Sequence, residues 1–165
     1  MSIVGNLKQI TKEELDRILT KSKVLEEMLD SENDNDLDID KAWEGIYFLF
    51  NGYGLADIDK TTEPFNLIFY GGQIVDEEQD LGYGPAYYIT PEQVQKISQS
   101  LKEVSDEEIQ KRYNPEKMMQ LGLYPEVWTE QPKEGLELLM ESIQDLRKFY
   151  ERAATEGKAV VTYLS

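Results

Sequence analysis

The chain has 165 residues, with 33 acidic and 17 basic side chains and a formal net charge of -16 at neutral pH. It contains no histidine and no cysteine, which excludes Ser-His-Asp and Cys-His nucleophilic sites, thiol redox chemistry, and imidazole or thiolate sites for zinc, iron or copper. The excess of negative charge opposes binding to phosphate backbones, and it favours a basic protein as the partner or simply solubility. Nucleic acid is therefore not expected as a partner.

Length and composition favour a single domain over residues 1–165. Hydrophobic residues make up 40% of the chain, which is enough material for a core. The first residues lack the basic region and long apolar stretch of a secretory leader, and no apolar run approaches the roughly 18 residues of a membrane-spanning helix. We therefore expect a cytoplasmic protein without membrane association. No cofactor motif is present, so no cofactor is expected either.

The first third of the chain is expected to hold a strand, two short helices and a loop. The strand is expected within residues 1–10. Thr11 and Glu14 have the spacing of a capping box, so a helix should follow directly, and apolar residues between 24 and 29 indicate a second one. The polar and acidic segment 30–38 is expected to be a loop.

Residues 39–50 form the most apolar helix candidate. Asp38 or Asp40 can cap its beginning, and Gly52 stands where a left-handed C-terminal cap belongs. Its large apolar residues recur at the spacing of one helix face, at Trp43, Ile46, Tyr47 and Phe50. We expect this central helix to be nearly surrounded by other elements.

Two further strands are expected in the middle of the chain, at residues 66–70 and 86–89. A helix should begin directly after the second of them. Thr90 is a good N-cap, Pro91 suits the first helical position, and Gln93 completes a capping box.

The C-terminal third is expected to be mainly helical. Short helices should begin after Ser105 and Asn114, Trp128 lies in a loop, and the longest helix spans residues 132–155. Residues 159–164 alternate well enough to be a final strand. The chain should therefore be an α+β protein, a mostly helical single domain with a small sheet formed by N-terminal, central and C-terminal strands.

Alternating acids in the segment 30–40 raise the question of a calcium site; they are Asp34, Asp36, Asp38 and Asp40. An EF-hand loop needs Gly at its sixth position and Glu at its twelfth. A loop that begins at Asp34 would have Ile39 and Gly45 at these positions, and one that begins at Asp36 fails as well. Helix capping by solvated acids is the preferred interpretation, so no metal site is assigned, and an irregular divalent-cation site is the alternative.

Three stretches of the sequence carry a resemblance to a known family. They are LDIDKAW at 37–43 leading to FNG at 50–52, LGYGPAYYITPEQV at 81–94, and YPEVW at 124–128 ahead of a long helix. In their order and spacing they resemble the YfbM-like family of small bacterial proteins, a domain-of-unknown-function group. The resemblance spans essentially the whole chain. It implies a compact α+β domain in a bacterial cytoplasm, and it supplies no reaction and no catalytic residues.

One ligand site is suggested by these stretches. If the loop at Gly82 meets the first turn of the Trp43 helix, Asp40, Lys41, Tyr83 and Tyr87 would surround a pocket. Each of these residues also has a structural role available, because aromatic side chains at strand edges usually pack in a sheet or core. No catalytic residue is assigned.

Two classes of function follow. The first is a non-enzymatic binding protein that acts through an acidic surface on a basic protein, for example as an immunity- or antitoxin-like protein. The alternative is a small-ligand binder, or an enzyme based on carboxylates and tyrosines, with its pocket near the Trp43 helix and the Gly82 loop. A mimic of DNA is a third possibility.

Overall fold

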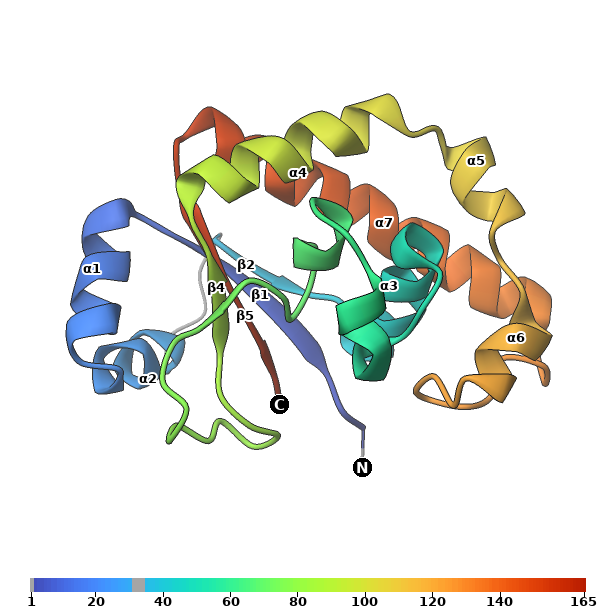
Figure 1. Cartoon of the computed structure of the whole chain (residues 1–165), viewed down its shortest axis with the longest axis horizontal. Helices are drawn as coiled ribbons and strands as arrows, with labels where there is room; N and C mark the ends of the chain where they lie inside the picture. The colour runs from blue at the N-terminus through green and yellow to red at the C-terminus, as the bar shows by residue number, and fades with distance from the viewer. Residues whose placement is uncertain (1, 31–34) are drawn as a thin grey trace.

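The computed structural model describes residues 2–30 and 35–165 (Figure 1). The strands in these ranges are β1 (Gly5–Ile10), β2 (Asp36–Asp38), β3 (Gln73–Ile74), β4 (Tyr87–Ile89) and β5 (Ala159–Leu164). The α-helices in the same ranges are α1 (Lys12–Thr20), α2 (Lys23–Leu29), α3 (Trp43–Asn51), α4 (Pro91–Glu103), α5 (Asp106–Lys111), α6 (Pro115–Gln120) and α7 (Pro132–Thr155). Three 3-10 helices complete them, η1 (Asp40–Ala42), η2 (Leu55–Lys60) and η3 (Phe65–Leu67). The fold is α+β, as the sequence predicts.

The strands form one sheet in the order β2-β1-β5-β4-β3, and every pairing in it is antiparallel. The two central strands come from opposite ends of the chain, with Gly5 opposite Leu164 and Ile10 opposite Ala159. The pairing continues beyond the strands, because Val4 and Ser165 exchange two backbone hydrogen bonds of 2.8 and 3.0 Å. The N- and C-terminal segments thus lock each other into the middle of the sheet (Figure 1).

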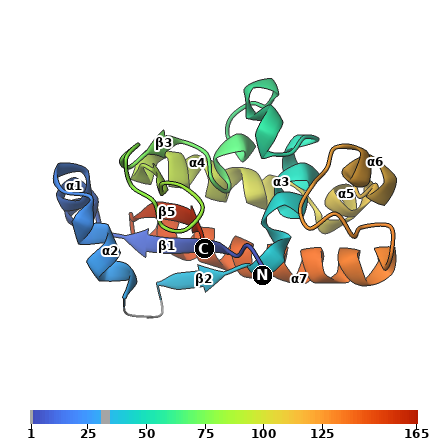
Figure 2. The ribbon, with the colours of Figure 1, turned by 90° about the horizontal axis from the view of Figure 1, so that it is seen from below.

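Successive side chains of β5 point to opposite faces of the sheet, as strand geometry requires. Val160 and Leu164 face the larger core, which also contains side chains of α3, α4 and α7. Ala159 and Val161 face a smaller core with side chains of α1 and α2. Figure 2 shows the consequence: α1 and α2 gather at one end of the molecule, and α3, α6 and the beginning of α7 lie at the other.

The capping boxes predicted at Thr11 and Thr90 are confirmed, whereas the cap predicted at Asp38 or Asp40 is wrong, because α3 begins at Trp43 without a side-chain cap. The Thr11 hydroxyl accepts a hydrogen bond from the Glu14 backbone N–H (3.1 Å), and the Glu14 carboxylate accepts one from the Thr11 N–H (2.8 Å). Thr90 and Gln93 make the same reciprocal pair at the start of α4. The apolar face of α3 is buried, and Gly52 ends this helix in a left-handed conformation with φ of 78°.

The strand predicted at residues 66–70 is wrong. This segment begins inside η3 and continues without pairing to the sheet. Leu67, Ile68 and Phe69 are consecutive and all buried, whereas a strand would send alternate side chains to opposite faces. The Tyr70 backbone N–H bonds to the hydroxyl oxygen of Thr162 (3.0 Å) instead of a strand carbonyl.

The loop predicted at residues 30–38 is only partly right, because Asp36–Asp38 pairs with β1 as β2. Residues 31–34 lie outside the described part of the chain. The ammonium of Lys8, whose side chain is only 3% exposed, lies 2.8 Å from the Asp36 carboxylate and ties this edge strand to its neighbour. Asp38 also fixes the next turn, since its carboxylate accepts a hydrogen bond of 2.7 Å from the Asp40 backbone N–H.

Candidate functional site

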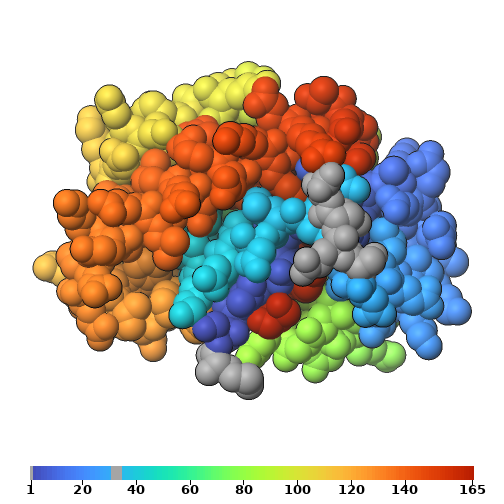
Figure 3. Space-filling view, turned by 180° about the vertical axis from the view of Figure 1, so that it is seen from behind, coloured from blue at the N-terminus to red at the C-terminus, as the bar shows by residue number. Residues whose placement is uncertain are grey.

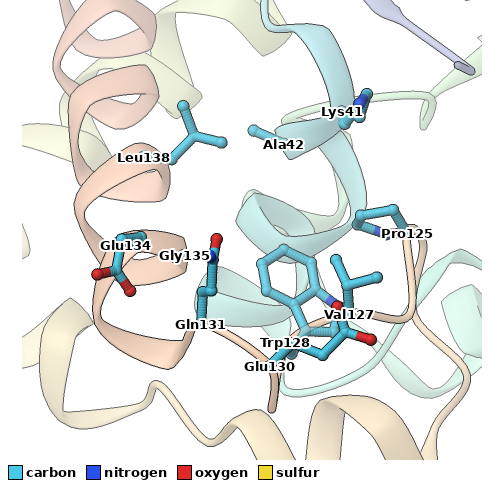
Figure 4. Close-up of a pocket in the computed structure, with 10 residues that line it drawn as sticks. All are labelled: Lys41, Ala42, Pro125, Val127, Trp128, Glu130, Gln131, Glu134, Gly135 and Leu138. Carbon is cyan, nitrogen blue, oxygen red and sulfur yellow. The ribbon is translucent and has the colours of Figure 1, made fainter.

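A surface groove of about 350 Å³ opens between η1, the first turns of α7 and the segment that precedes α7 (Figure 4). Five lining residues are polar or charged or are glycine: Lys41, Glu130, Gln131, Glu134 and Gly135. The other lining residues are apolar, and they are Ala42, Pro125, Val127, Trp128 and Leu138. An apolar surface with a few polar groups around it is the usual composition of a binding site.

Trp128 forms the floor of this groove, one helical glycine makes room for it, and a second lies beside it. A Cβ atom on Gly45 of α3 would lie 2.6 Å from Cη2 of Trp128, which no real contact permits. A Cβ atom on Gly135 of α7 would lie 3.6 Å from Cε3 of the same ring. The Trp128 indole N–H donates to the Leu123 carbonyl at 3.0 Å, which fixes the orientation of the ring.

The segment that carries Trp128 is anchored to α3 by Glu44. One carboxylate oxygen of Glu44 accepts from the Tyr124 backbone N–H at 2.8 Å, and the other accepts from the Leu55 N–H at 3.1 Å. The Tyr124 ring also stacks on Trp43, with centroids 5.3 Å apart. These contacts place the residues around 124–128 against the first turn of the central helix.

The two sides of the groove carry apolar side chains that remain open to solvent. Val127 is 44% exposed and Leu138 is 50% exposed, although both are large and aliphatic. Single exposed apolar residues are normal on a protein surface, but these two line the same hollow, above the Trp128 ring, and offer apolar area to one ligand.

The charge around the groove is strongly one-sided. Between residues 126 and 145 the chain has six acidic side chains and one basic one, Lys133. All six acids are exposed; they are Glu126, Glu130, Glu134, Glu137, Glu141 and Asp145. Lys41 is the one cation among the lining residues, and it lies at the η1 end, away from Glu130 and Glu134 (Figure 4).

The acidic side chains of α7 lie close to a second acidic segment of the chain. Helix α7 runs beside the β2–η1 segment on one face of the molecule (Figure 3). That segment adds the exposed side chains of Asp36, Asp38 and Asp40 to the same region. We call residues 126–145 together with 36–41 the acidic face.

Tyr83 and Tyr87 lie in a different part of the fold, around Tyr70. The Tyr70 and Tyr87 rings are 4.3 Å apart at their centroids, and the Tyr70 hydroxyl donates to the carbonyls of Tyr83 and Pro85. Burial is the main cause of a raised pKa at the Tyr70 hydroxyl. This cluster closes the turn around Gly84 and packs it on the sheet.

The Gly82 loop is shaped by the carboxylate of Asp80. This group accepts hydrogen bonds from the backbone N–H groups of Gly82 (2.9 Å) and Gly84 (3.2 Å), and these bonds hold the pKa of Asp80 below its usual range. The loop therefore folds onto its own acid, beside Leu164 and Ser165 at the chain end.

The four residues of the suggested pocket are not brought together. Lys41 lines the groove, whereas Tyr83 and Tyr87 do not. Strands β1 and β5 separate β2, which precedes Asp40, from β4, which carries Tyr87; three strand spacings correspond to roughly 14 Å. Ligand binding at Asp40, Tyr83 and Tyr87 stays a prediction without a shared cavity.

The comparisons with known proteins agree with this architecture. The family model described as "Domain of unknown function (DUF1877)" matches residues 1–163. The chain belongs to this family. It is also similar to the crystal structure of a protein of unknown function, YfbM from Escherichia coli, with a TM-score of 0.78 and 17% identity over 98% of this chain and 99% of that one. No curated protein matches the sequence. The resemblance to YfbM-like proteins is thereby confirmed, and at this identity the structural likeness establishes the fold alone.

Two of the three stretches that suggested the DUF1877 family converge at the groove. The stretch with Lys41 and Ala42 and the stretch with Pro125, Val127 and Trp128 supply the floor and one side of it, and α7 supplies the opposite side (Figure 4). The third stretch, 81–94, forms the Asp80 loop region, β4 and the start of α4 instead.

Sequence reasoning about this DUF1877 chain missed the groove residues on α7 and the role of Trp128. One signal was present, because Leu138 falls outside the helical stripe of Leu139, Ile143 and Leu146, which is buried in the core. A leucine on the polar side of an amphipathic helix indicates an exposed apolar position. The glycines at 45 and 135 gave no comparable signal.

Two negative findings concern the described residues. Within residues 2–30 and 35–165, no group of three or more acidic side chains is arranged to hold a metal ion; Asp34 of the acidic segment lies outside these ranges. In the same part of the chain, none of the helices combines the length and the apolar character needed to cross a bilayer.

Proposed function

We propose that this DUF1877 protein is a non-enzymatic binding protein that recognises a positively charged protein through the acidic face. The net charge of -16 provides long-range attraction for a basic partner and repulsion for other acidic molecules. One form of this role is an immunity- or antitoxin-like protein that covers a basic partner in the cytoplasm.

The observation that carries the proposal is an open apolar groove inside the acidic face. Charge alone speeds encounter but gives little affinity, because exposed ion pairs are weak in water. Val127 and Leu138 offer apolar area that a partner can bury, and Glu130 and Glu134 lie beside it. Apolar contacts surrounded by charged groups form the usual anatomy of a protein–protein interface.

The alternative function, a small-ligand binder or a carboxylate- and tyrosine-based enzyme, has weaker support. The groove volume of about 350 Å³ is within the range of small-molecule sites. However, Glu130 and Glu134 are exposed, so they lack the burial that tunes catalytic carboxylates. The tyrosines expected at the site lie around Tyr70 instead.

The test is a pull-down from lysate at low and high salt, followed by mass spectrometry. The bait is compared with a Glu134→Gln/Glu137→Gln/Glu141→Gln variant of the acidic face. A matched variant removes three charges at the other end of the molecule, Glu13→Gln/Glu26→Gln/Glu27→Gln. We expect a basic protein that binds the wild type and the matched variant at low salt, is lost in high salt, and binds the acidic-face variant poorly. Binding that resists salt, or only acidic proteins on the bait, would contradict the proposal.

A further inference from the structure

The two ends of the groove differ in charge, with Lys41 at one and Glu130 and Glu134 at the other. This asymmetry defines the kind of segment that fits the groove. We infer that the groove binds a partner segment that places an apolar side chain between Val127 and Leu138, next to a lysine or arginine that lies at Glu130 and Glu134 and points away from Lys41. The inference rests on the proposed function and specifies the chemistry of its contact.

Val127 and Leu138 are exposed on the two sides of the groove and can hold an apolar side chain between them. A partner side chain inserted between Val127 and Leu138 would cover both of them and would lie above the Trp128 ring. The floor is already formed in the free protein, since the indole is held by its hydrogen bond to Leu123 and packed against Gly45. Little ordering is then needed on this side of the contact, which favours affinity.

The two ends of the groove carry side chains of opposite charge. Glu130 and Glu134 line one end, and their neighbours Glu126 and Glu137 add to the negative potential there. Lys41 lines the other end and repels a basic side chain in direct contact with it, while its chain neighbours Asp38 and Asp40 are exposed acids of the acidic face. A segment with its basic residue on one side of the apolar anchor is therefore favoured in one direction, since the reverse direction brings its cation against Lys41.

A basic partner explains the groove better than a second copy of this chain does. Two copies would each bring a net charge of -16, and the acidic face of each would meet the acidic face of the other. Repulsion of this kind costs affinity and slows encounter. Charge complementarity instead selects a segment rich in lysine or arginine.

The experiment is a selection of displayed random dodecapeptides on the immobilised full chain. Enriched peptides are then measured individually against the wild type, Leu138→Glu and the matched control Leu19→Glu. Leu19 is an exposed leucine on α1, at the other end of the molecule, with an exposed fraction of 43% against 50% for Leu138. Unchanged melting temperatures verify that both variants fold.

We expect enriched peptides to share an apolar side chain with a lysine or arginine close to one side of it. Their affinity should fall about tenfold or more for Leu138→Glu, the loss that corresponds to one buried apolar contact, and stay unchanged for Leu19→Glu. A second selection on Lys41→Glu should lose the one-sided placement of the basic residue, because both ends of the groove would then attract cations.

The outcomes separate this inference from the proposed function. Basic peptides that bind Leu138→Glu as well as the wild type would overturn the groove contact and leave the acidic-face function standing. Peptides without basic residues, or no enrichment at all, would overturn the inference, and the salt-dependent pull-down would still test the function independently. Sedimentation could also show a dimer of the wild type that is absent for Leu138→Glu. A second copy of the chain would then occupy the groove, and this result would also overturn the inference.

Discussion

Trp43 and Tyr124 stack with their ring centroids 5.3 Å apart and their planes 15° from parallel, and together they hold the backbone of Ile3 from both sides. The Trp43 indole N–H donates to the Ile3 carbonyl at 2.9 Å, and the Tyr124 hydroxyl accepts from the Ile3 N–H at 2.8 Å. The N-terminal segment, the central helix and the segment beneath the groove are therefore joined at one point.

Tyr124→Phe tests the junction directly. The variant keeps the stacked ring but removes the acceptor for the Ile3 N–H, so we expect the free energy of unfolding to fall by about 1 kcal/mol. Chemical denaturation measures the change. Tyr83→Phe, at a tyrosine that is 41% exposed, is the control and should be near neutral. Equal stability of both variants would show that the hydrogen bond to Ile3 contributes nothing.

Gly45→Ala should destabilise the protein although it lies within a helix. In a solvent-exposed helix interior, replacing Gly by Ala stabilises the helix by about 1 kcal/mol. Here the added Cβ would lie 2.6 Å from Cη2 of Trp128 and 2.8 Å from Cδ2 of Leu139, and overpacking of this kind typically costs about 1–3 kcal/mol.

Gly135→Ala is the matched comparison for Gly45→Ala. Its added Cβ would meet the Tyr113 hydroxyl at 2.8 Å, at the end of a side chain that can move, so the loss of stability should be smaller. Denaturation curves of the two variants give the ranking. A Gly45→Ala protein more stable than the wild type would contradict the close packing of Trp128 against α3.

Glu44→Gln tests the anchor beneath the groove. Both carboxylate oxygens of Glu44 accept backbone hydrogen bonds, from Tyr124 and Leu55. Glutamine has one acceptor oxygen, and its NH₂ group would face the second N–H donor, so we expect a loss of about 1–3 kcal/mol in the free energy of unfolding. Glu77→Gln, at an exposed acid, is the control. A Glu44→Gln protein as stable as this control would contradict the role of the Glu44 carboxylate as the anchor of the Tyr124 segment.

The pH dependence of stability should include a contribution from Asp80. Hydrogen bonds from Gly82 and Gly84 lower the pKa of its carboxyl. A group with a lowered pKa stabilises the fold above its unfolded pKa of about 3.9, and this contribution is lost as the pH falls through the lower folded value. Asp80→Ala should therefore lower the melting temperature at neutral pH, and the difference from the wild type should shrink in acid.

Glu77→Ala, which removes one negative charge from the same stretch, is the control for the Asp80 measurement. Its melting temperature relative to the wild type separates the effect of net charge from the effect of the two glycine hydrogen bonds. A difference between Asp80→Ala and the wild type that persists unchanged into strong acid would rule out the carboxylate as its cause.

Sequence reasoning succeeded where the physical cause is local. The caps at Thr11 and Thr90 depend on residues three positions away, and the central helix depends on its own apolar spacing. It failed for residues 66–70 because an apolar run does not distinguish a strand from a turn that is buried on all sides. It missed β2 because the pairing partner of this acidic strand is β1, far along the chain.

The candidate site was harder to predict for the same reason. A pocket of Asp40, Lys41, Tyr83 and Tyr87 requires two signature stretches to meet, and the sheet order keeps Lys41 and Tyr87 apart. The groove instead depends on which side chains are left uncovered, such as Leu138, and on Gly45, which admits a tryptophan that is distant in the sequence. These are tertiary properties, and only the off-stripe position of Leu138 was visible in the sequence.

The most direct test of the central claim is an NMR titration of the ¹⁵N-labelled protein with its basic partner or a selected peptide. The chain has two tryptophans, so two indole N–H resonances report on the groove floor at Trp128 and on the Ile3 junction at Trp43. We predict that the Trp128 resonance shifts and saturates at low salt, that the Trp43 resonance moves less, and that Leu138→Glu abolishes the shift. A partner that binds while the Trp128 resonance stays in place would contradict the assignment of the groove as the binding site.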